Sequence, residues 1–363
     1  MVRMKKSIDL QDAENLSSWY EKNKRELPWR DTGNPYDVWL SEIMLQQTRI
    51  EAVKPKFLLF KKELPSIEDL SEVDQDRLMR LWEGMGYYSR ARNLKKCAEI
   101  LVKDYEGKLP SDFKVLKKLP GIGPYTAGAI ASIAYGKAVP AVDGNVMRVL
   151  ARYLEITDDI RDPKTRKSFE EIISGLFQQR NDSSFVRSFN QGLMELGEVI
   201  CVPNGSPHCK ECPWQNACKA HLHQDTGQIP YRSSLKKRKI IERTLFILRD
   251  GNQFLLRKRD EKGLLAGLYE FPGIDRKLNQ TEVIREVEKY GIVPVHVKRL
   301  PDSKHIFTHL EWHMTAYEIQ TEEIENLKDD RCILADKKEL SSLAIPSAFH
   351  TYIEWYSLRD GSE

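Results

Sequence analysis

Apolar residues recur at helical spacing through the first part of the chain. In segments 76–82, 91–105 and 145–154 they repeat every three or four residues, and proline or glycine separates such segments. A period near 3.6 is typical of amphipathic helices, whereas Pro and Gly are typical of the turns between them. The pattern therefore predicts an all-α region that extends to about residue 223.

The pattern changes beyond this helical region. A stretch rich in Pro, Ser and Lys predicts an exposed linker over residues 224–240, and a period of two follows it. Two apolar runs flank the Asp-Gly-Asn of residues 250–252, which is a typical hairpin turn. Segment 310–317 alternates in the same way, and segment 282–290 could form one helix. We therefore expect a smaller α+β domain over residues 241–363.

Composition and charge narrow the class of protein. The chain has 363 residues, 40% of them hydrophobic, which is enough for two folded domains and excludes wholesale disorder. Its longest apolar stretches are only a few residues, so we expect neither a membrane span nor a secretion signal, and hence a cytoplasmic protein. Because 57 Lys and Arg nearly balance 54 Asp and Glu, a nucleic-acid site would need its basic residues on one face.

Four of the six cysteines lie close together and predict a metal centre. They follow the spacing Cys-x7-Cys-x2-Cys-x5-Cys and are Cys201, Cys209, Cys212 and Cys218. In a reducing compartment such a cluster indicates metal binding rather than disulfides. One CxxC pair with two flanking cysteines in a helical region favours a [4Fe–4S] cluster. The alternative is a zinc site that recruits a neighbouring histidine, from the set His208, His221 and His223.

A glycine-rich turn precedes an Ala- and Gly-rich helix in segment 119–136. Gly121 and Gly123 permit a tight turn whose backbone N–H groups point outward at the start of that helix. Together with the helix dipole, these donors would bind a phosphate without reading sequence. The small residues that follow would let another helix pack closely. A plain helix–turn–helix without a ligand is the alternative.

Two carboxylates could form an acid–base pair, and the first is Glu42. It is predicted on a helix that begins with Asn34 as the N-cap and Pro35 as the first residue. Glu42 shares a face of this helix with apolar residues. Burial against them would favour its protonated form, which suits a general acid. A solvated helix glutamate is the alternative.

The second carboxylate, Asp143, lies where an apolar run ends and a helix begins. It could simply cap that helix, as could Asn145. At a helix N-terminus, however, the dipole would also hold Asp143 ionised. One protonated and one ionised carboxyl is the division of roles that cleavage of a glycosidic bond needs.

In this order, the glycine hairpin, the aspartate and the cysteine cluster resemble the helix–hairpin–helix DNA glycosylases related to endonuclease III. The resemblance is greatest to the branch of that family that acts on adenine. It rests on long, specific strings over residues 27–30, 41–49, 82–94, 119–129 and 142–150, and it covers essentially the whole chain.

The resemblance implies a multi-domain fold. An all-α helix–hairpin–helix glycosylase region would occupy residues 1–223. It would comprise a six-helix barrel at about residues 30–136 and an iron–sulfur cluster module built from residues 1–29 and 137–223. A Nudix-like α+β domain would follow the linker. The seven residues between the first two cysteines are one more than the family usually has, which a loop absorbs without changing the ligands.

The resemblance also assigns roles to single residues. Glu42 would protonate adenine and later handle the attacking water, and Asp143 would stabilise the oxocarbenium-like sugar. Tyr125 and Asn145 would support them. Entry of side chains into the duplex beside the lesion is consistent with base flipping, and the residues expected to contact DNA are Arg30, Gln47, Thr48, Tyr87, Gly121, Gly123, Phe307, Thr308 and His309.

The residue at position 125 distinguishes two reaction types. Relatives that also cleave the strand carry a lysine at this place in the hairpin, and its amine forms a Schiff base with the sugar. Tyr125 has no amine, so water should be the acceptor. This predicts a monofunctional glycosylase. A pyrimidine-lesion glycosylase and lyase is the alternative, with Lys118 as the nearest amine in the sequence.

The C-terminal domain resembles the Nudix-like recognition domain of the adenine branch. Its Nudix box is too short after Gly273 and lacks a Glu-Glu pair, so we expect no nucleotide hydrolysis. The family recognises 8-oxoguanine with a Phe-Ser-His loop, and this chain has Phe307-Thr308-His309. Thr308 is therefore the expected base reader, and an ordinary strand residue is the alternative.

The expected partner is duplex DNA with adenine opposite 8-oxoguanine or guanine, bound by a monomer at the nucleoid of a bacterium. Two other classes of protein are less compatible with the sequence. An inert iron–sulfur DNA-binding protein would not need both Glu42 and Asp143. A nucleotide-pool hydrolase would need a complete Nudix box.

Overall fold

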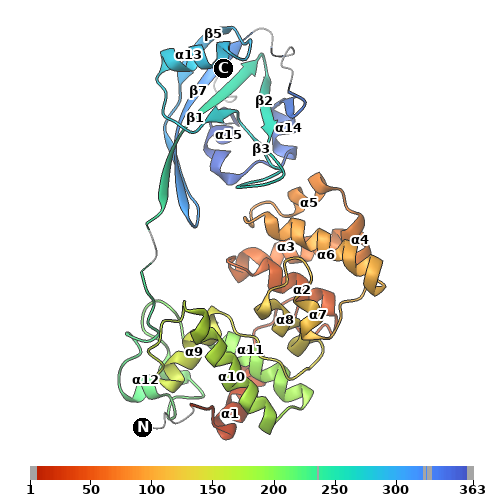
Figure 1. Ribbon diagram of the computed structural model, residues 1–363, viewed down its shortest axis with the longest axis vertical. Coiled ribbons are helices and arrows are strands. Elements are labelled where there is room, and N and C mark those ends of the chain that lie inside the picture. The colour runs from red at the N-terminus through yellow and green to blue at the C-terminus, as the bar shows by residue number, and fades with distance from the viewer. Residues whose placement is uncertain (1–5, 235–236, 322–323, 325–328, 358–363) are drawn as a thin grey trace. The chain divides into compact units, whose positions relative to one another are not determined.

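The computed structural model describes residues 6–234, 237–321, 324 and 329–357 (Figure 1). Residues 235 and 236 of the predicted linker lie outside this set. The chain forms two units, one of residues up to 73 and 92–234, the other of residues 74–91 and those that follow 234.

Helices dominate the chain up to residue 222, as the apolar period predicts. Their bounds are α1 (Leu10–Asn23), α2 (Pro35–Met44), α3 (Ile50–Glu63), α4 (Ile67–Glu72), α5 (Gln75–Leu81), α6 (Ser89–Tyr105), α7 (Phe113–Leu116), α8 (Pro124–Ala129), the π-helical turn η1 (Ile130–Ala134), α9 (Gly144–Leu154), α10 (Pro163–Gln179), α11 (Ser183–Val199), the 3-10 turn η2 (Cys209–Glu211) and α12 (Lys219–Leu222). Within the described ranges, no helix combines the length and apolar character that crossing a membrane requires.

Short polar side chains determine where several of these helices begin. The Asn34 side chain accepts a hydrogen bond from the Tyr36 N–H, which confirms the predicted cap of α2. Asp182 accepts one from the Phe185 N–H at the start of α11. Such caps satisfy N–H groups that have no partner within the helix.

The core beside the site is built by α1, α9, α10 and α11. α11 contacts α1, α9 and η1, and its buried face includes Phe185 and Phe189. These two rings stack with their centroids 5.7 Å apart. α11 is therefore packed on several sides, which fixes the position of its backbone beside the site.

The predicted close approach to the Ala- and Gly-rich helix is present, although its nearest neighbour is not a helix. A Cβ at Gly128 of α8 would lie 2.1 Å from the carbonyl oxygen of Pro140. The segment that leads into α9 can therefore pass directly against α8 because residue 128 has no side chain.

The C-terminal part of the second unit is a mixed sheet. Its strands are β1 (Lys239–Asp250), β2 (Gln253–Lys258), β3 (Tyr269–Glu270), β4 (Gly273–Ile274), β5 (Pro294–Arg299), β6 (Ser303–Ile306), β7 (Leu310–Thr321) and β8 (Cys332–Ala335). The main order is β3-β2-β1-β7-β5, with β4 on β1, β6 on β7 and β8 on β2. β1 and β7 are parallel, whereas the other pairs are antiparallel.

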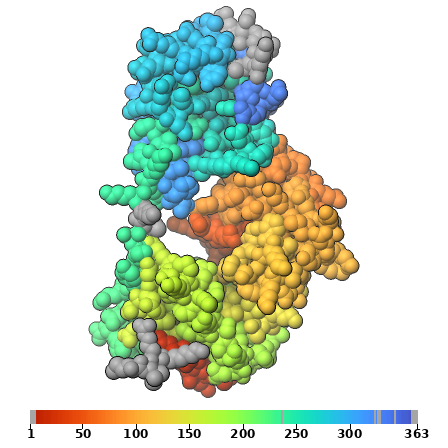
Figure 2. Space-filling view, viewed as in Figure 1, coloured from red at the N-terminus to blue at the C-terminus, as the bar shows by residue number. Residues whose placement is uncertain are grey.

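Both faces of this sheet are covered. Leu245 and Ile247 of β1 belong to one apolar cluster, whereas Phe246 and Leu248 belong to the cluster on the other face. The first cluster includes side chains of α14 (Lys337–Ser342), η3 (Ser347–Phe349) and α15 (His350–Ser357), and the second includes α13 (Gln280–Glu288). α13 contacts β5, and the two lie together on the face shown in Figure 2.

The local predictions for this domain are confirmed. β1 and β2 form the expected hairpin, with Asp250 paired to Gln253 across a two-residue turn. Gly251 has φ +53°, the conformation that favours glycine in such a turn. The alternating segment at 310–317 is part of β7, and the predicted helix is α13.

Two glycine substitutions test the close approach at α8. Gly128→Ala should lower the free energy of unfolding by about 1–3 kcal/mol, since its Cβ would collide with the Pro140 backbone. Gly175→Ala, in the interior of α10 with open space around the added Cβ, should raise it by up to about 1 kcal/mol. Urea unfolding measures both, and a Gly128→Ala protein as stable as the wild type would contradict the packing.

Candidate active site

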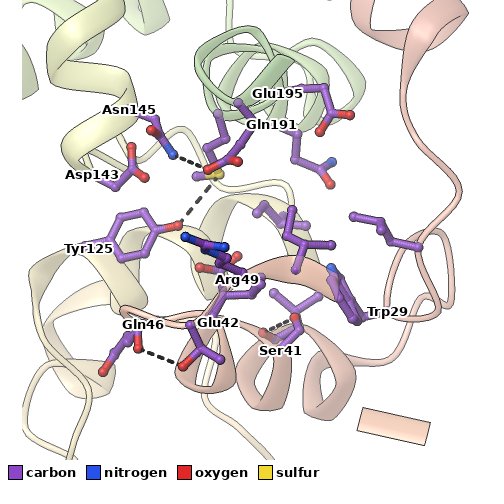
Figure 3. Close-up of a pocket in the computed structure, with 18 of the residues that line it drawn as sticks. Trp29, Ser41, Glu42, Gln46, Arg49, Tyr125, Asp143, Asn145, Gln191 and Glu195 are labelled. Atoms are coloured by element: carbon purple, nitrogen blue, oxygen red, sulfur yellow. Dashed lines mark hydrogen bonds between the residues drawn. The ribbon is translucent and has the colours of Figure 1, made fainter. Parts of the chain in front are cut away.

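Side chains from α2, α8, α9 and α11 line a single pocket of about 970 Å³ (Figure 3). α2 contacts α8 and η1, and α11 contacts α9 and η1, so these elements pack together around the pocket. The sequence-predicted residues that line the pocket are Arg30, Glu42, Gln47, Thr48, Tyr125, Asp143 and Asn145. Tyr87, Gly121, Gly123 and the segment 307–309 lie outside it. The fold therefore unites all four residues expected to take part in the chemistry.

Glu42 is a buried carboxyl. Only 8% of the residue is exposed, and Val38 and Trp39 of the same helix are buried too. Burial raises the pKa of Glu42 to about 7. The Asp143 charge also raises it, whereas the Tyr125 hydrogen bond and the Arg30 charge lower it. The solvated-glutamate alternative is wrong, and Glu42 retains a proton at pH values at which an exposed glutamate would be ionised.

Asp143 is the N-cap of α9 and accepts a hydrogen bond of 2.7 Å from the Val146 N–H. The capping interpretation is therefore confirmed. Burial nevertheless raises the pKa of Asp143, although the Val146 N–H and the Arg148 charge lower it. The direction expected from the helix dipole alone is wrong, because desolvation outweighs the backbone contribution.

Tyr125 lies beside both carboxyls. Its O–H is 3.7 Å from the Met194 sulfur, and its side chain also hydrogen-bonds with Glu42. Burial and the charges of Glu42 and Asp143 raise the pKa of Tyr125 well above its usual range. The phenol therefore stays neutral, and Figure 3 shows its ring reaching toward the space between α2 and α11.

A buried ion-pair cluster forms another wall of the pocket. Both Glu195 oxygens accept bonds from Arg25, at 2.6 and 3.0 Å, and one accepts a 2.5 Å bond from Arg30. Glu195 is 1% exposed. Burial raises the pKa of Glu195, but hydrogen bonds from Arg25 and Arg30 lower it, and the net value is about 2. Glu195 is therefore an anion that fixes two guanidinium groups.

Among the lining residues that no sequence pattern predicted are Arg25, Gln191, Glu195 and Glu198. Glu195 and Glu198 are the two acids of α11, and no local pattern in this helix distinguishes them as site residues. Only tertiary packing shows that Glu198 bonds Asn145 next to Asp143, and that Glu195 bonds Arg25 and Arg30.

The glycine hairpin has the predicted form. Gly121 has φ +76°, and a Cβ there would lie 2.8 Å from the Asn93 Cβ, so both backbone conformation and packing require glycine. Gly123 is the N-cap of α8 and has no side-chain cap bond. A Cβ at Gly123 would meet no atom within 4 Å. The start of α8 is therefore sterically open.

Within the second unit, Thr308 lies in a turn between β6 and β7, so the strand alternative is wrong. The residue is exposed, and its hydroxyl lies 2.5 Å from the Tyr87 hydroxyl. Phe307 packs edge-on against His305 and Trp312. Two of the predicted DNA contacts, Tyr87 and Thr308, thus lie together.

The four clustered cysteines are free thiols that affect one another electrostatically. The pKa of Cys212 is raised to about 12, chiefly by burial, and Cys201, Cys218 and Cys209 contribute to this rise. Arg152 donates a hydrogen bond of 3.2 Å to the Cys201 sulfur. Among the residues that the structure describes, no three ligand side chains are gathered closely enough to hold a metal ion in this arrangement.

Comparisons with known proteins agree with this architecture. Residues 40–175 match the model of the HhH-GPD superfamily of base excision DNA repair proteins, and residues 244–355 match the NUDIX domain. Adenine DNA glycosylase of Buchnera aphidicola subsp. Schizaphis graminum is 33% identical over 344 residues, which cover 93% of this chain and 96% of the relative. The chain belongs to the adenine DNA glycosylase family. The human family member is 32% identical over 85% of this chain and 66% of its own length.

A solved structure extends the agreement to the helical fold. A thermostable thymine-DNA glycosylase has a TM-score of 0.52 and 28% identity, and the match covers 58% of this chain and 95% of that chain. The predicted fold class is confirmed: a helical glycosylase region is joined to a Nudix-like domain. The family places a base excision reaction in the same chain as the Glu42–Asp143 pocket.

The Tyr125 hydrogen bond gives a test of the pKa of Glu42. Since this bond lowers the pKa, Tyr125→Phe should raise it and allow the acid to keep its proton at higher pH. In the pH–rate profile, the single-turnover rate of base release should fall above about pH 7 in the wild type. In the variant, this fall should occur at higher pH. A fall at the same pH in both proteins would show that another group is titrating.

Proposed function

We propose that this protein hydrolyses the N-glycosidic bond of adenine mispaired with 8-oxoguanine or guanine in duplex DNA. The observation that carries the proposal is the buried Glu42 carboxyl, whose pKa near 7 makes it a proton donor beside a second carboxyl in a pocket that can hold a flipped base. The family relationship supplies adenine as the base, because its relatives are adenine DNA glycosylases.

The two carboxyls divide the reaction between them. Glu42 donates its proton to a ring nitrogen of adenine, and the glycosidic electron pair leaves with the base. Asp143, as an anion, stabilises the positive charge that develops on the sugar. Water then attacks the anomeric carbon and returns a proton to Glu42. The products are free adenine and an abasic site.

The cations around the pocket favour a glycosylase without lyase activity. Among the described lining residues every basic side chain is an arginine, namely Arg25, Arg30, Arg49 and Arg166. A guanidinium group remains charged and does not act as an amine nucleophile. Lys118, the nearby amine in the sequence, is exposed and does not line the pocket. Water is therefore the acceptor of the sugar.

Backbone geometry supports DNA entry by Gln47 and Tyr87. Both residues have positive φ, at +57° and +48°, which is unusual for residues other than glycine. Both side chains are exposed. Such conformations are often found at functional positions, where they direct a side chain outward. We propose that each of these residues enters the duplex beside the lesion.

The hairpin and the Nudix-like domain complete the DNA contacts. The open space at Gly123 lets a phosphate approach the start of α8. Arg30 and Thr48, which line the pocket, also contact the DNA. Phe307, Thr308 and His309 form the turn that recognises the opposite base, with the hydroxyl of the exposed Thr308 as its reader.

The cysteine set fits a [4Fe–4S] cluster by its donor chemistry. Cys201, Cys212 and Cys218 pack against the helical core, and Arg152 donates a hydrogen bond to the Cys201 sulfur. Cys209 supplies the fourth thiol. Held by these four thiols, a cluster would cross-link the segment between α11 and α12.

Base release from defined duplexes tests the proposed reaction. From a duplex with one A·8-oxoguanine pair, the protein should release adenine, and the DNA strand should be nicked only after treatment with alkali. Thymine glycol and A·T duplexes should remain intact. Glu42→Gln, which keeps size but removes the acid, should lower the single-turnover rate by about 10²- to 10⁴-fold.

Glu171→Gln is the matched control, because Glu171 is an exposed glutamate of α10 outside the pocket. It should leave the rate unchanged. Strand cleavage without alkali would contradict the inference from Tyr125 and would show that the protein is also a lyase. Release only from the damaged pyrimidine would contradict adenine as the substrate.

The Thr308 hydroxyl can be tested by isosteric replacement. Thr308→Val keeps the shape but removes the hydroxyl, so the preference for 8-oxoguanine over guanine should fall by about 3- to 10-fold, the value of one hydrogen bond. Thr308→Ser should retain the preference. The ratio of dissociation constants for the two mispairs measures it, and an unchanged ratio in Thr308→Val would exclude Thr308 as the reader.

A further inference from the structure

The Asn145 amide is held at both ends. Its Nδ2 donates a 2.8 Å hydrogen bond to Glu198 Oε1, and its Oδ1 accepts a 2.9 Å bond from Arg148 Nη2. Asn145 and Glu198 both line the pocket, from α9 and α11 respectively (Figure 3 labels Asn145). With both ends bonded, the amide plane has one preferred orientation next to Asp143.

α11 reaches Asn145 because residue 197 is glycine. A Cβ on Gly197 would lie 2.7 Å from the Asn145 Cβ. Arg148 is fixed as well, since its Nη2 donates to the Gly197 oxygen and its Nε to the Cys201 oxygen, both at 2.7 Å. Glu198, unlike Arg148 and Gly197, is exposed. It places a carboxylate at a pocket that must admit the polyanionic backbone of DNA.

We propose that Glu198 is a positioning residue of the glycosylase reaction: it orients the Asn145 amide beside Asp143, and its negative charge limits the affinity of the pocket for DNA. This inference rests on the proposed function. The two effects are separable, because a glutamine at position 198 keeps an oxygen that can accept the Asn145 bond but carries no charge. An alanine there removes both.

The charge also predicts a pH effect. Asp143 is surrounded by Glu42 from α2, Tyr125 from α8, Arg148 from α9 and Glu198 from α11. Glu198 raises the pKa of Asp143, so its neutralisation should let Asp143 ionise at lower pH. The low-pH limb of the rate profile should therefore move to lower pH in Glu198→Gln.

The experiment compares Glu198→Gln and Glu198→Ala with the wild type on the A·8-oxoguanine duplex. Glu198→Ala should reduce the single-turnover rate by about tenfold or more, because Asn145 loses its orientation. Glu198→Gln should retain most of the rate and shift the low-pH limb. In a Glu42→Gln background, which binds without turnover, Glu198→Gln should tighten DNA binding by about two- to fivefold at low salt, whereas the exposed control Glu171→Gln should not.

The possible failures can be told apart. Equal rates for Glu198→Ala and the wild type would overturn the positioning role. An equal loss of rate in Glu198→Ala and Glu198→Gln, with an unmoved low-pH limb, would also overturn it. Wild-type protein that releases no adenine would instead contradict the proposed function.

Discussion

Burial of the Glu42 carboxyl is the constraint on which the rest of the site depends. A carboxyl of this kind ionises near pH 4.5 in water, and desolvation is the largest cause of its rise to about 7. Desolvation in turn requires that α2 be covered by α8 and η1. The close passage of the Pro140 backbone over Gly128 brings α9, and with it Asp143, to the same pocket. The same helix packing therefore buries Glu42 and places Asp143 in the pocket with it.

This arrangement lowers the stability of the fold at high pH. Because the folded-state pKa of Glu42 lies above its unfolded value, its favourable contribution is complete below pH 4.5 and is lost as the pH rises through about 7, a difference of about 3 kcal/mol. Glu195 behaves in the opposite way. Its pKa of about 2 means that it stabilises the fold above pH 4.5 and loses this effect as the pH falls toward 2. Since the two shifts are similar in size, the ion-pair wall offsets the cost of the buried acid near neutral pH.

Local patterns in the sequence predict local structure well. The Asn34 cap, the helical periods and the 250–252 turn each depend on a few adjacent residues, and all are present. Properties that depend on distant segments could not be predicted in this way. The pKa of Asp143 rises because the surrounding structure buries this residue. The local sequence indicates only the helix dipole, which acts in the opposite direction. Glu198 likewise becomes part of the site only because α11 packs against α9.

The pocket's cations are arginines, two of them paired with Glu195, and this arrangement is compatible with a protonated Glu42. A pocket that binds DNA needs positive charge, yet a cation near Glu42 stabilises its anion and lowers its pKa, as Arg30 does. An unpaired cation cluster would therefore return Glu42 toward its value in water. Glu195 prevents this, because it binds Arg25 and Arg30 and neutralises part of their charge. Arginine can make such forked contacts while staying protonated, whereas a lysine that lost its proton in the same pocket would offer an amine to the sugar. In the proposed reaction, paired guanidinium groups thus provide positive charge for DNA, let Glu42 keep its proton and leave the attack on the sugar to water.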